Sequence, residues 1–300
     1  MREGVLGKAT HGSAAPFGSQ APTARLLMCA PALYGIRYRI NPWMRPQGDD
    51  SVRALALAQW RRLHATLSGY ARIELVEAVP GVPDMVFTAN AGFVFGEAVV
   101  PSRFRHAERR GEEAPFRAWF EANGFDLVDL PRGLSFEGAG DALLDRALPL
   151  AWVGHGFRSD AAVAPWLEHA LDLEVASLKL VDPRFYHLDT CLCPLERGEL
   201  LYYPGAFDEA SAARIESRVP SARRIALGER DALAFACNAV SVGGAVVLNR
   251  ASRALRETLE ARGYAVRAVA LGSFIRAGGA AKCLTLRLDE KPLAREWAAA

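Results

Sequence analysis

A recurring order of predicted secondary structure constrains the fold of this chain more than any other feature of its sequence. Hydrophobic spacing predicts about five units of strand, strand, helix and strand, each of roughly fifty residues. The predicted helices cover residues 51–70, 112–124, 159–171, 208–218 and 251–262. Repeats of this length are typical of propeller-like or solenoid arrays, in which each unit buries its apolar face against its neighbours. The sequence therefore predicts an α/β fold whose units surround a common axis.

A single domain accounts for the whole repeat. No linker rich in Gly, Ser and Pro interrupts residues 25–290, so one domain over residues 25–300 is expected. A doubly wound sheet is the alternative, but it would show single strands alternating with helices. Residues 1–24 are rich in Gly, Ala, Ser and Pro and have no apolar core, which predicts a disordered segment rather than a secretory signal.

The composition argues against several classes of partner. Charged residues make up 23% of the chain, the formal net charge is +2, and no run reaches five like charges, so nothing indicates nucleic acid or an anionic membrane. The longest apolar runs are too short to span a bilayer. Five cysteines, an odd number in a chain without a signal, predict reduced thiols in the cytoplasm. The sequence leaves a homo-oligomer open.

Polar residues gather where a turn enters a strand, about once in each predicted unit. These clusters are Asp84 to Asn90, Glu137 to Asp141, His187 to Asp189, Asn238 and Cys283. Equivalent strand ends of a pseudosymmetric ring converge on its axis, so the clusters together predict one central site. Each cluster alone also has an ordinary explanation: a loop carboxylate, an interior histidine, or an asparagine that tolerates a left-handed turn.

The last cluster contains the candidate nucleophile. Gly278 and Gly279 predict a tight turn that leads through Cys283 into a short strand ending at Leu288. Lys282 beside the thiol would help to lower its pKa and favour the reactive thiolate. The alternative for a lone cysteine is a buried structural residue.

No metal and no cofactor are expected. Cys191 and Cys193, with His187 nearby, form a C-x-C pair that lacks the usual spacing of zinc ligands. In a strand, the two thiols would share one face with Asp189. Gly278-Gly279 is too short for a phosphate-binding fingerprint, and no phosphate-binding loop motif occurs.

Three of these motifs resemble the guanidine-modifying enzymes. They are Glu137 in F-E-G-A-G-D, His187 and Asp189 in H-L-D-T, and Cys283 in G-G-x-x-K-C, and they occur in that order. The resemblance covers residues 25–290. The superfamily includes arginine deiminases, dimethylarginine dimethylaminohydrolases, agmatine deiminases and amidinotransferases. It implies a five-bladed α/β propeller of ββαβ units with the site on the axis, and a covalent thiouronium intermediate on the cysteine.

One residue separates subgroups within this superfamily. In deiminases the segment that matches Phe87-Thr88-Ala89-Asn90 ends in an aspartate that binds the guanidinium. This chain has Asn90 at that position. T-A-N, together with Asn41 in I-N-P-W-M, is similar to the arginine dihydrolases. The resemblance implies hydrolysis of L-arginine to L-ornithine, ammonia and carbon dioxide. The larger proteins of that group carry an additional C-terminal domain, which these 300 residues do not include.

The chemistry of a guanidinium assigns a role to each residue. A planar, cationic group rich in donors suits carboxylates, and Glu137 and Asp189 are the first candidates to bind it. Cys283 would attack the central carbon, and His187 would protonate the leaving ammonia and then activate water. An amide at Asn90 can donate as well as accept, so it can hold the urea oxygen of citrulline for a second cycle.

Further residues are candidates for the rest of the substrate. The candidates for the substrate carboxylate are Arg103, Arg105, Arg109 and Arg110, and the first choice is Arg109. The alternative for each of them, at least as well supported, is an exposed position at a basic helix start. Candidates for other contacts with the substrate are Asn41 and Asn238, at the α-amino group, and Asp84 and Asp141.

Other functions remain open at this stage. An arginine deiminase or a dimethylarginine dimethylaminohydrolase would stop at citrulline, and an amidinotransferase would pass the amidino group to another amine. A propeller-like scaffold without catalysis is the alternative of a different class. It gives no reason for Glu137, His187 and Cys283 to stand together at strand entrances.

Overall fold

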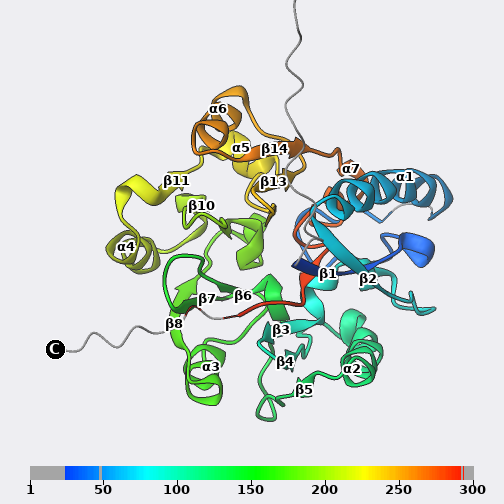
Figure 1. The fold of residues 1–300 in the computed structure, drawn as a ribbon. Helices are drawn as coiled ribbons and strands as arrows, with labels where there is room; N and C mark the ends of the chain where they lie inside the picture. The colour runs from blue at the N-terminus through cyan, green and yellow to red at the C-terminus, as the bar shows by residue number, and fades with distance from the viewer. Residues whose placement is uncertain (1–23, 47–48, 292, 294–300) are drawn as a thin grey trace, which may run out of the picture.

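Five three-stranded sheets surround a central axis in the computed structural model, and the longer helices lie on the outside of the ring (Figure 1). The structure describes residues 24–46, 49–291 and 293. The predicted disordered segment 1–24 lies outside these residues, apart from Ala24, which is the first residue of a strand.

Four blades repeat one topology: an antiparallel hairpin, then a helix, then an outer strand parallel to the second strand of the hairpin. The second to fifth blades contain β3 (Gly92–Phe95), β4 (Ala98–Pro101), α2 (Glu113–Ala122) and β5 (Asp126–Leu127); β6 (Ala142–Leu144), β7 (Leu150–His155), α3 (Val163–Leu171) and β8 (Glu174–Lys179); β9 (Leu192–Pro194), β10 (Leu200–Tyr202), α4 (Glu209–Arg218) and β11 (Arg224–Ala226); and β12 (Val240–Val242), β13 (Ala245–Leu248), α6 (Arg253–Ala261) and β14 (Ala265–Ala268). Two short helices, α5 (Glu229–Leu233) and α7 (Gly272–Ile275), lie in the connections.

The first blade is built from both ends of the described chain. It contains β1 (Ala24–Cys29), α1 (Asp49–Ser68), β2 (Ala71–Val76) and β15 (Leu286–Arg287). β15 pairs antiparallel with β1, and β1 pairs parallel with β2. This pairing closes the ring and holds the turn that contains Cys283 beside the first strand.

The helices follow from local sequence signals. Ser252 caps α6 because its hydroxyl accepts a hydrogen bond from the backbone N–H of Leu255 at 3.2 Å. Leu255 and Leu259, one turn apart, are buried against the sheet, and each buried leucine contributes about 1.5–3 kcal/mol. Gly263, with a φ of +84°, ends the helix in a left-handed turn.

Several predicted boundaries were wrong. Residues 92–101 form a hairpin, because Gly96 with a φ of +64° reverses the chain between β3 and β4. The helix predicted from residue 159 begins at Val163, and the one predicted from Ser51 begins at Asp49. The polar clusters do lie in turns that precede strands, and those at Asp84–Asn90, Glu137–Asp141 and His187–Asp189 include short 3₁₀ helices. The sequence interpretation missed β11, α5 and α7.

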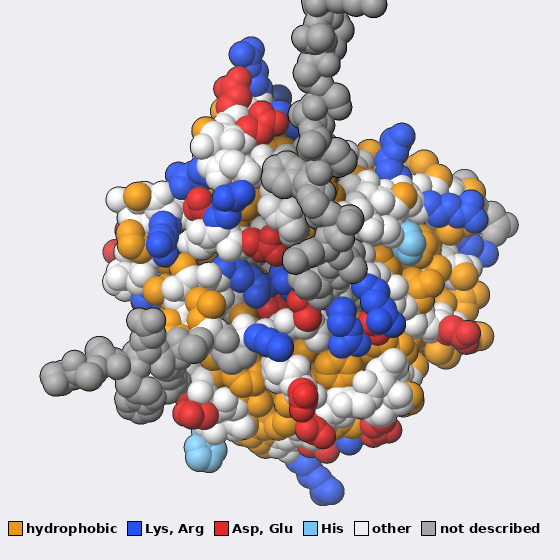
Figure 2. All heavy atoms as spheres, in the orientation of Figure 1, with side chains coloured by type: hydrophobic (Ala, Val, Ile, Leu, Met, Phe, Trp, Pro, Cys, Tyr) orange, Lys and Arg blue, Asp and Glu red, His pale blue; other side chains and the backbone are white. Residues whose placement is uncertain are grey.

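Packing between blades divides the interior into five hydrophobic clusters. Acidic side chains lie among basic ones on the face seen in Figure 2, in keeping with the formal net charge of +2. Within the described ranges, no helix combines the length and the apolar character that crossing a bilayer requires.

Candidate active site

The turns that enter the first strands of the blades bring several of the predicted residues to one small cavity, which is lined by Asn41, Asp84, Asn90, Arg109, His187 and Cys283. Glu137, Asp189 and Asn238 do not line it but contact His187 or Cys283. Three of these turns are the 3₁₀ helices Thr88–Ala91, Gly138–Gly140 and Leu188–Thr190, which begin or end beside the polar clusters. The side chains of Asn90 and His187 both line this cavity. The expected convergence on one central site is therefore observed.

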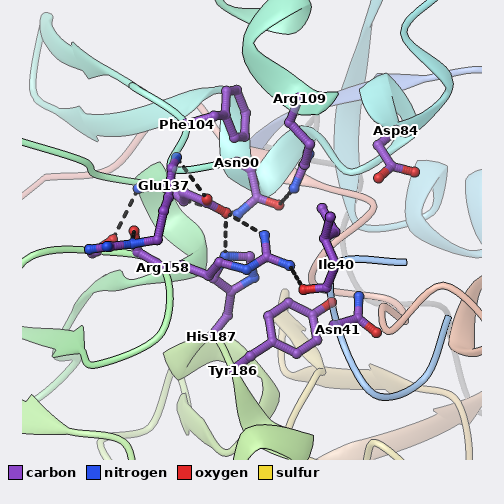
Figure 3. Close-up of polar contacts among 12 residues, drawn as sticks. Ile40, Asn41, Asp84, Asn90, Phe104, Arg109, Glu137, Arg158, Tyr186 and His187 are labelled. Atoms are coloured by element: carbon purple, nitrogen blue, oxygen red, sulfur yellow. Dashed lines mark hydrogen bonds and ion pairs between the residues drawn. The ribbon is translucent and has the colours of Figure 1, made fainter. Parts of the chain in front are cut away.

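Glu137 and His187 form the centre of a buried ionic network (Figure 3). Oε2 of Glu137 lies 2.7 Å from Nε2 of His187 and accepts a hydrogen bond from Nη1 of Arg158 at 3.0 Å. Glu137 is fully buried and His187 is 1% exposed. Burial alone would raise the pKa of Glu137, but Arg158 and the hydrogen bond from His187 lower it well below its usual range. Glu137 is therefore an ionised carboxylate that orients the imidazole.

Asn90 is fixed at both ends of its amide. Its Oδ1 accepts a hydrogen bond from Nη1 of Arg109 at 2.9 Å, and its Nδ2 donates to the backbone oxygen of Glu137 at 2.9 Å. Arg109 in turn donates from Nε and Nη2 to the two oxygens of Glu112, each at 2.8 Å. One N–H of the Asn90 amide is left for a ligand.

The thiol of Cys283 lies in the turn before β15 and contacts two polar side chains. Its sulfur lies 3.4 Å from Oδ2 of Asp189 and 3.0 Å from Nδ2 of Asn238. Oδ1 of Asn238 also accepts hydrogen bonds from the backbone N–H groups of Cys283 and Ala280, at 3.1 and 2.9 Å. Asn238 therefore fixes the turn formed by residues 280–283, here called the nucleophile turn. The sequence had suggested it instead for the α-amino group of a substrate.

Burial and the neighbouring Asp189 raise the pKa of the Cys283 thiol well above its ordinary value. Lys282 does lower the pKa of this thiol, as expected, but burial and Asp189 outweigh it in the protein without substrate. Burial also raises the pKa of Asp189 to about 6. The resting sulfur is thus a protonated thiol that donates to a carboxylate.

Asp84 presents an unpaired oxygen in the cavity. Its Oδ2 accepts a hydrogen bond from the hydroxyl of Tyr38 at 2.8 Å, whereas its buried Oδ1 has no hydrogen-bond partner among the described residues. Burial raises the pKa of this carboxyl. A buried acceptor without a partner costs about 1–3 kcal/mol, so a donor on a ligand would stabilise this side chain.

Asp141 and Asn41 are occupied by the protein itself. Asp141 accepts from the backbone N–H of Leu188 at 3.0 Å and from the hydroxyl of Ser159 at 2.6 Å, and it does not line the cavity. Asp141 therefore stabilises the turn after His187 and does not reach the cavity, where the sequence had suggested a contact with substrate. Asn41 lines the cavity while its Nδ2 donates to the backbone oxygen of Ala277 at 2.9 Å.

Of the candidate arginines, the structure brings only Arg109 to the cavity, together with Arg158, which sequence reasoning missed. Arg105 is exposed and pairs with Asp160, and Arg103 and Arg110 bind backbone oxygens outside the cavity. Arg158 donates to Glu137 and, at 3.1 Å, to the backbone oxygen of Ile40. No motif in the sequence marks Arg158.

The two remaining thiols of interest are not arranged as a metal site. Cys191 and Cys193 pack in different hydrophobic clusters rather than on one face, and their sulfurs donate to backbone oxygens at 3.4 Å. Within the described part of the chain, no three His, Cys, Asp or Glu side chains are grouped closely enough to hold a metal ion.

The sequence of this chain is similar to those of known proteins over most of its length. The family model for eukaryotic N,N dimethylarginine dimethylhydrolase matches residues 40–289. The N(G),N(G)-dimethylarginine dimethylaminohydrolase of Mycobacterium tuberculosis is 40% identical over 92% of this chain and 91% of its own length. The bifunctional arginine dihydrolase/ornithine cyclodeaminase ArgZ of Synechocystis sp. is 53% identical over 90% of this chain. The present chain spans only 38% of the length of that relative.

Solved structures confirm the fold class. The N-terminal domain of ArgZ, an arginine dihydrolase solved as a cysteine-to-serine variant bound to substrate, matches with a TM-score of 0.88 and 53% identity, covering 90% of this chain and 100% of that one. A dimethylarginine dimethylaminohydrolase at 20% identity matches with a TM-score of 0.72, covering 88% of this chain and 98% of its own, and shows the same fold. The predicted five-bladed α/β propeller is confirmed, and the chain belongs to the dimethylarginine dimethylhydrolase family of the guanidine-modifying enzymes.

Proposed function

We propose that this protein is an arginine dihydrolase that converts L-arginine to L-ornithine, two molecules of ammonia and carbon dioxide. The observation that carries the proposal is the buried thiol of Cys283 on the same small cavity as His187, which is hydrogen-bonded to Glu137. Relatives described as arginine dihydrolases share 53% identity, and one was solved covalently bound to a reaction intermediate. The activity of the whole protein remains part of the proposal, because the chain covers 38% of that relative.

The guanidinium supplies the charge that the thiol needs. A buried thiol beside a carboxylate ionises with difficulty, and a substrate cation placed against Asp189 and Cys283 offsets both effects. The carboxylates proposed to bind the guanidinium edges are Asp84, which lines the cavity and has an unpaired oxygen, and Asp189, which contacts the sulfur of Cys283. Asp189 is also the nearest acceptor for the thiol proton.

The first cycle then has two steps. The thiolate of Cys283 bonds to the guanidinium carbon, the bond from that carbon to a terminal nitrogen breaks, and His187 protonates the leaving ammonia. His187 next removes a proton from a water that attacks the thiouronium carbon. The carbon–sulfur bond breaks, which returns the thiol and leaves the ureido group of citrulline. Glu137 stabilises the imidazolium that forms in each step.

The second cycle repeats the same chemistry on bound citrulline. The thiolate attacks the ureido carbon and the second ammonia leaves, so that a thiocarbamate remains on the sulfur. Water cleaves this thiocarbamate to a carbamate, which breaks down to ornithine and carbon dioxide. The free N–H of Asn90 is positioned by Arg109 and by the backbone of Glu137 to donate to the urea oxygen.

The amino-acid end of the substrate needs cations and acceptors. We propose Arg109, with Arg158 second, for the carboxylate, since both are buried and line the cavity. Asn41 and the neighbouring backbone oxygen of Ile40 are candidates for the α-amino group. Arg109 already binds Glu112, which leaves part of its guanidinium for a substrate oxygen.

The cysteines indicate the setting in which the enzyme works. All five cysteines are free thiols, which supports a reducing, cytoplasmic location. We propose residues 25–300 as one catalytic domain.

Product analysis tests the assignment. Purified protein is incubated with L-arginine, and ornithine, citrulline and ammonia are quantified; ornithine with two equivalents of ammonia is expected. If turnover stops at citrulline, the protein is a deiminase instead. Asymmetric dimethylarginine is assayed in parallel, because the relative from M. tuberculosis is named for that substrate. Release of dimethylamine faster than ammonia would replace the proposal with that activity.

Asn90→Asp tests the reason given for the second cycle. The new carboxylate would hold guanidinium, so citrulline should still form. The carboxylate cannot donate a hydrogen bond, so it would repel both the urea oxygen of citrulline and the backbone oxygen of Glu137. Citrulline should therefore leave before the second hydrolysis. An unchanged ratio of citrulline to ornithine would contradict this role of Asn90.

A further inference from the structure

A second cavity lies behind the nucleophile, separate from the one that holds His187. Its volume is about 50 Å³, room for a few water molecules, and its walls include Lys282, Thr285, Arg146, Arg287 and Glu290. Cys283 lines the first cavity and its sequence neighbour Lys282 lines the second. The nucleophile turn therefore separates the two cavities, and a substrate on the Cys283 side leaves Lys282 in place.

The charges around this rear cavity are unevenly matched. Arg146 forms a two-point ion pair with Glu290 at 2.6 and 2.7 Å. Arg287 lies 3.2 Å from Glu196 and 3.3 Å from Asp289. Lys282, by contrast, forms no ion pair with any carboxylate of the described residues. Its ammonium has one hydrogen bond there, to the backbone oxygen of Ala139 at 3.3 Å.

The field of this ammonium acts on the reacting groups. Lys282 is half-buried, and it is the strongest of the groups that lower the pKa of Asp189 against the effect of burial. It also lowers the pKa of Cys283, though less than the contact from Asn238 does. The other titratable groups that its charge reaches are Glu290 and Cys193.

The two cycles of the proposed reaction differ in what the substrate brings. Arginine carries a cation to the buried thiol, but citrulline is neutral and brings none. The second ionisation of Cys283 must therefore rely on charges that belong to the protein. Arg109 and Arg158 lie on the substrate side and are held by Glu112 and Glu137, whereas Lys282 has no such partner among the described residues.

We propose that Lys282 is a positioning residue for the second hydrolysis: its ammonium, in the rear cavity, keeps Asp189 ionised and stabilises the Cys283 thiolate when neutral citrulline fills the site. The proposal rests on the dihydrolase function. It predicts that removal of this charge impairs the citrulline step more than the arginine step, since arginine replaces the missing cation.

Lys282→Gln tests this role, because the amide can still donate to Ala139 while the charge is lost. Citrulline and ornithine are followed in time from arginine, and ornithine formation is measured separately from added citrulline over a range of pH. We expect the rate of the citrulline step to fall about tenfold relative to the arginine step, the change that one unit in the thiol pKa would cause. The pH profile of the citrulline step should move to higher pH, and Lys282→Arg should restore both.

Arg287→Met is the matched control. It removes a cation from the same cavity, but one that two carboxylates already neutralise, so the product ratio should stay as in the wild type. If Lys282→Gln and Lys282→Met slow both steps equally, or neither, or if Lys282→Arg restores nothing, the proposal is overturned. If the wild type makes no ornithine, the dihydrolase function itself fails, which is a distinguishable result.

Discussion

The sulfur of Cys283 lies 3.4 Å from Oδ2 of Asp189, so the nucleophile rests against a carboxylate in a buried site. This contact makes the free enzyme a poor nucleophile and the complex with a cation a good one. Reactivity of the thiol is thereby tied to the charge of whatever occupies the cavity.

Alkylation measures this dependence directly. At neutral pH, neutral iodoacetamide should inactivate the enzyme slowly, and its rate should rise with pH up to at least about 9, because burial and Asp189 raise the thiol pKa. A cationic amidine alkylating agent should react much faster at the same pH, and arginine should protect. Equal rates for the neutral and cationic reagents at pH 7 would show that the thiol is already ionised.

Replacement of the nucleophile should abolish turnover. Cys283→Ser keeps a small hydrogen-bonding side chain beside Asp189 and Asn238, so the fold should remain, but a hydroxyl is a far weaker nucleophile near neutral pH. Cys193→Ser is the matched control, since that thiol is also buried and donates to the backbone oxygen of Ala239. Only the first variant should lose ammonia release. Turnover by Cys283→Ser on any guanidine would rule out the covalent route.

Variants of Glu137 and of His187 should differ in their effects on KM and kcat. Glu137→Gln removes a charge-assisted partner of Arg158 and His187, worth about 1.5–3 kcal/mol, and should raise KM as well as lower kcat. His187→Ala should mainly lower kcat, by about 10²–10⁴-fold for a lost general acid–base group. Steady-state kinetics with arginine gives both values. Loss of activity on adding a chelator to the wild type would instead point to a metal.

The acid limb of the pH profile should report Asp189. Its carboxyl has a pKa of about 6, so kcat/KM should fall as the pH drops through about 6. The folded-state pKa lies above the ordinary value, so protonation on acidification stabilises the fold through this group, and activity should fall without unfolding. Bound arginine favours the carboxylate, so the limb in kcat should lie at lower pH. A fall in kcat/KM that follows loss of circular dichroism would contradict this assignment.

The sequence predicted those features that depend on local order. The five units follow from periodic hydrophobic residues, and Glu137, His187 and Cys283 follow from motifs that each stand at a turn before a strand. The convergence of these motifs is a consequence of the ring topology, so it could be expected before any distance was known.

Features set by tertiary contact could not be predicted in this way. Lys282 was weighed as the neighbour of Cys283 because it is adjacent in sequence, yet Asp189, 94 residues away, contacts the thiol and raises its pKa. Arg158 reaches Glu137 from the loop after β7, where no motif marks it. Asp141 belongs to the same cluster as Glu137, but the fold turns it toward Ser159 and the backbone of Leu188.

Gly140 provides the last prediction, because it allows Asn90 to reach its place. A Cβ at residue 140 would lie 2.3 Å from Nδ2 of Asn90 and 3.4 Å from Cγ of His187. Gly140→Ala should therefore push the amide away from the backbone oxygen of Glu137 and spoil its contact with the urea oxygen. The expected result is a larger share of citrulline in the products from arginine, with the first cycle less affected.

Gly154→Ala is the control for crowding alone. Its Cβ would lie 2.8 Å from the Cβ of Leu188 and 3.3 Å from Oδ1 of Asp141, so it disturbs the same region without touching Asn90. It should lower stability and total activity while leaving the ratio of citrulline to ornithine unchanged. Because Asn90 is held by Arg109 on its other side, Gly140→Ala and Asn90→Asp should shift the ratio in the same direction. If Gly140→Ala lowers both products in proportion, the close approach serves packing and not the choice between one hydrolysis and two.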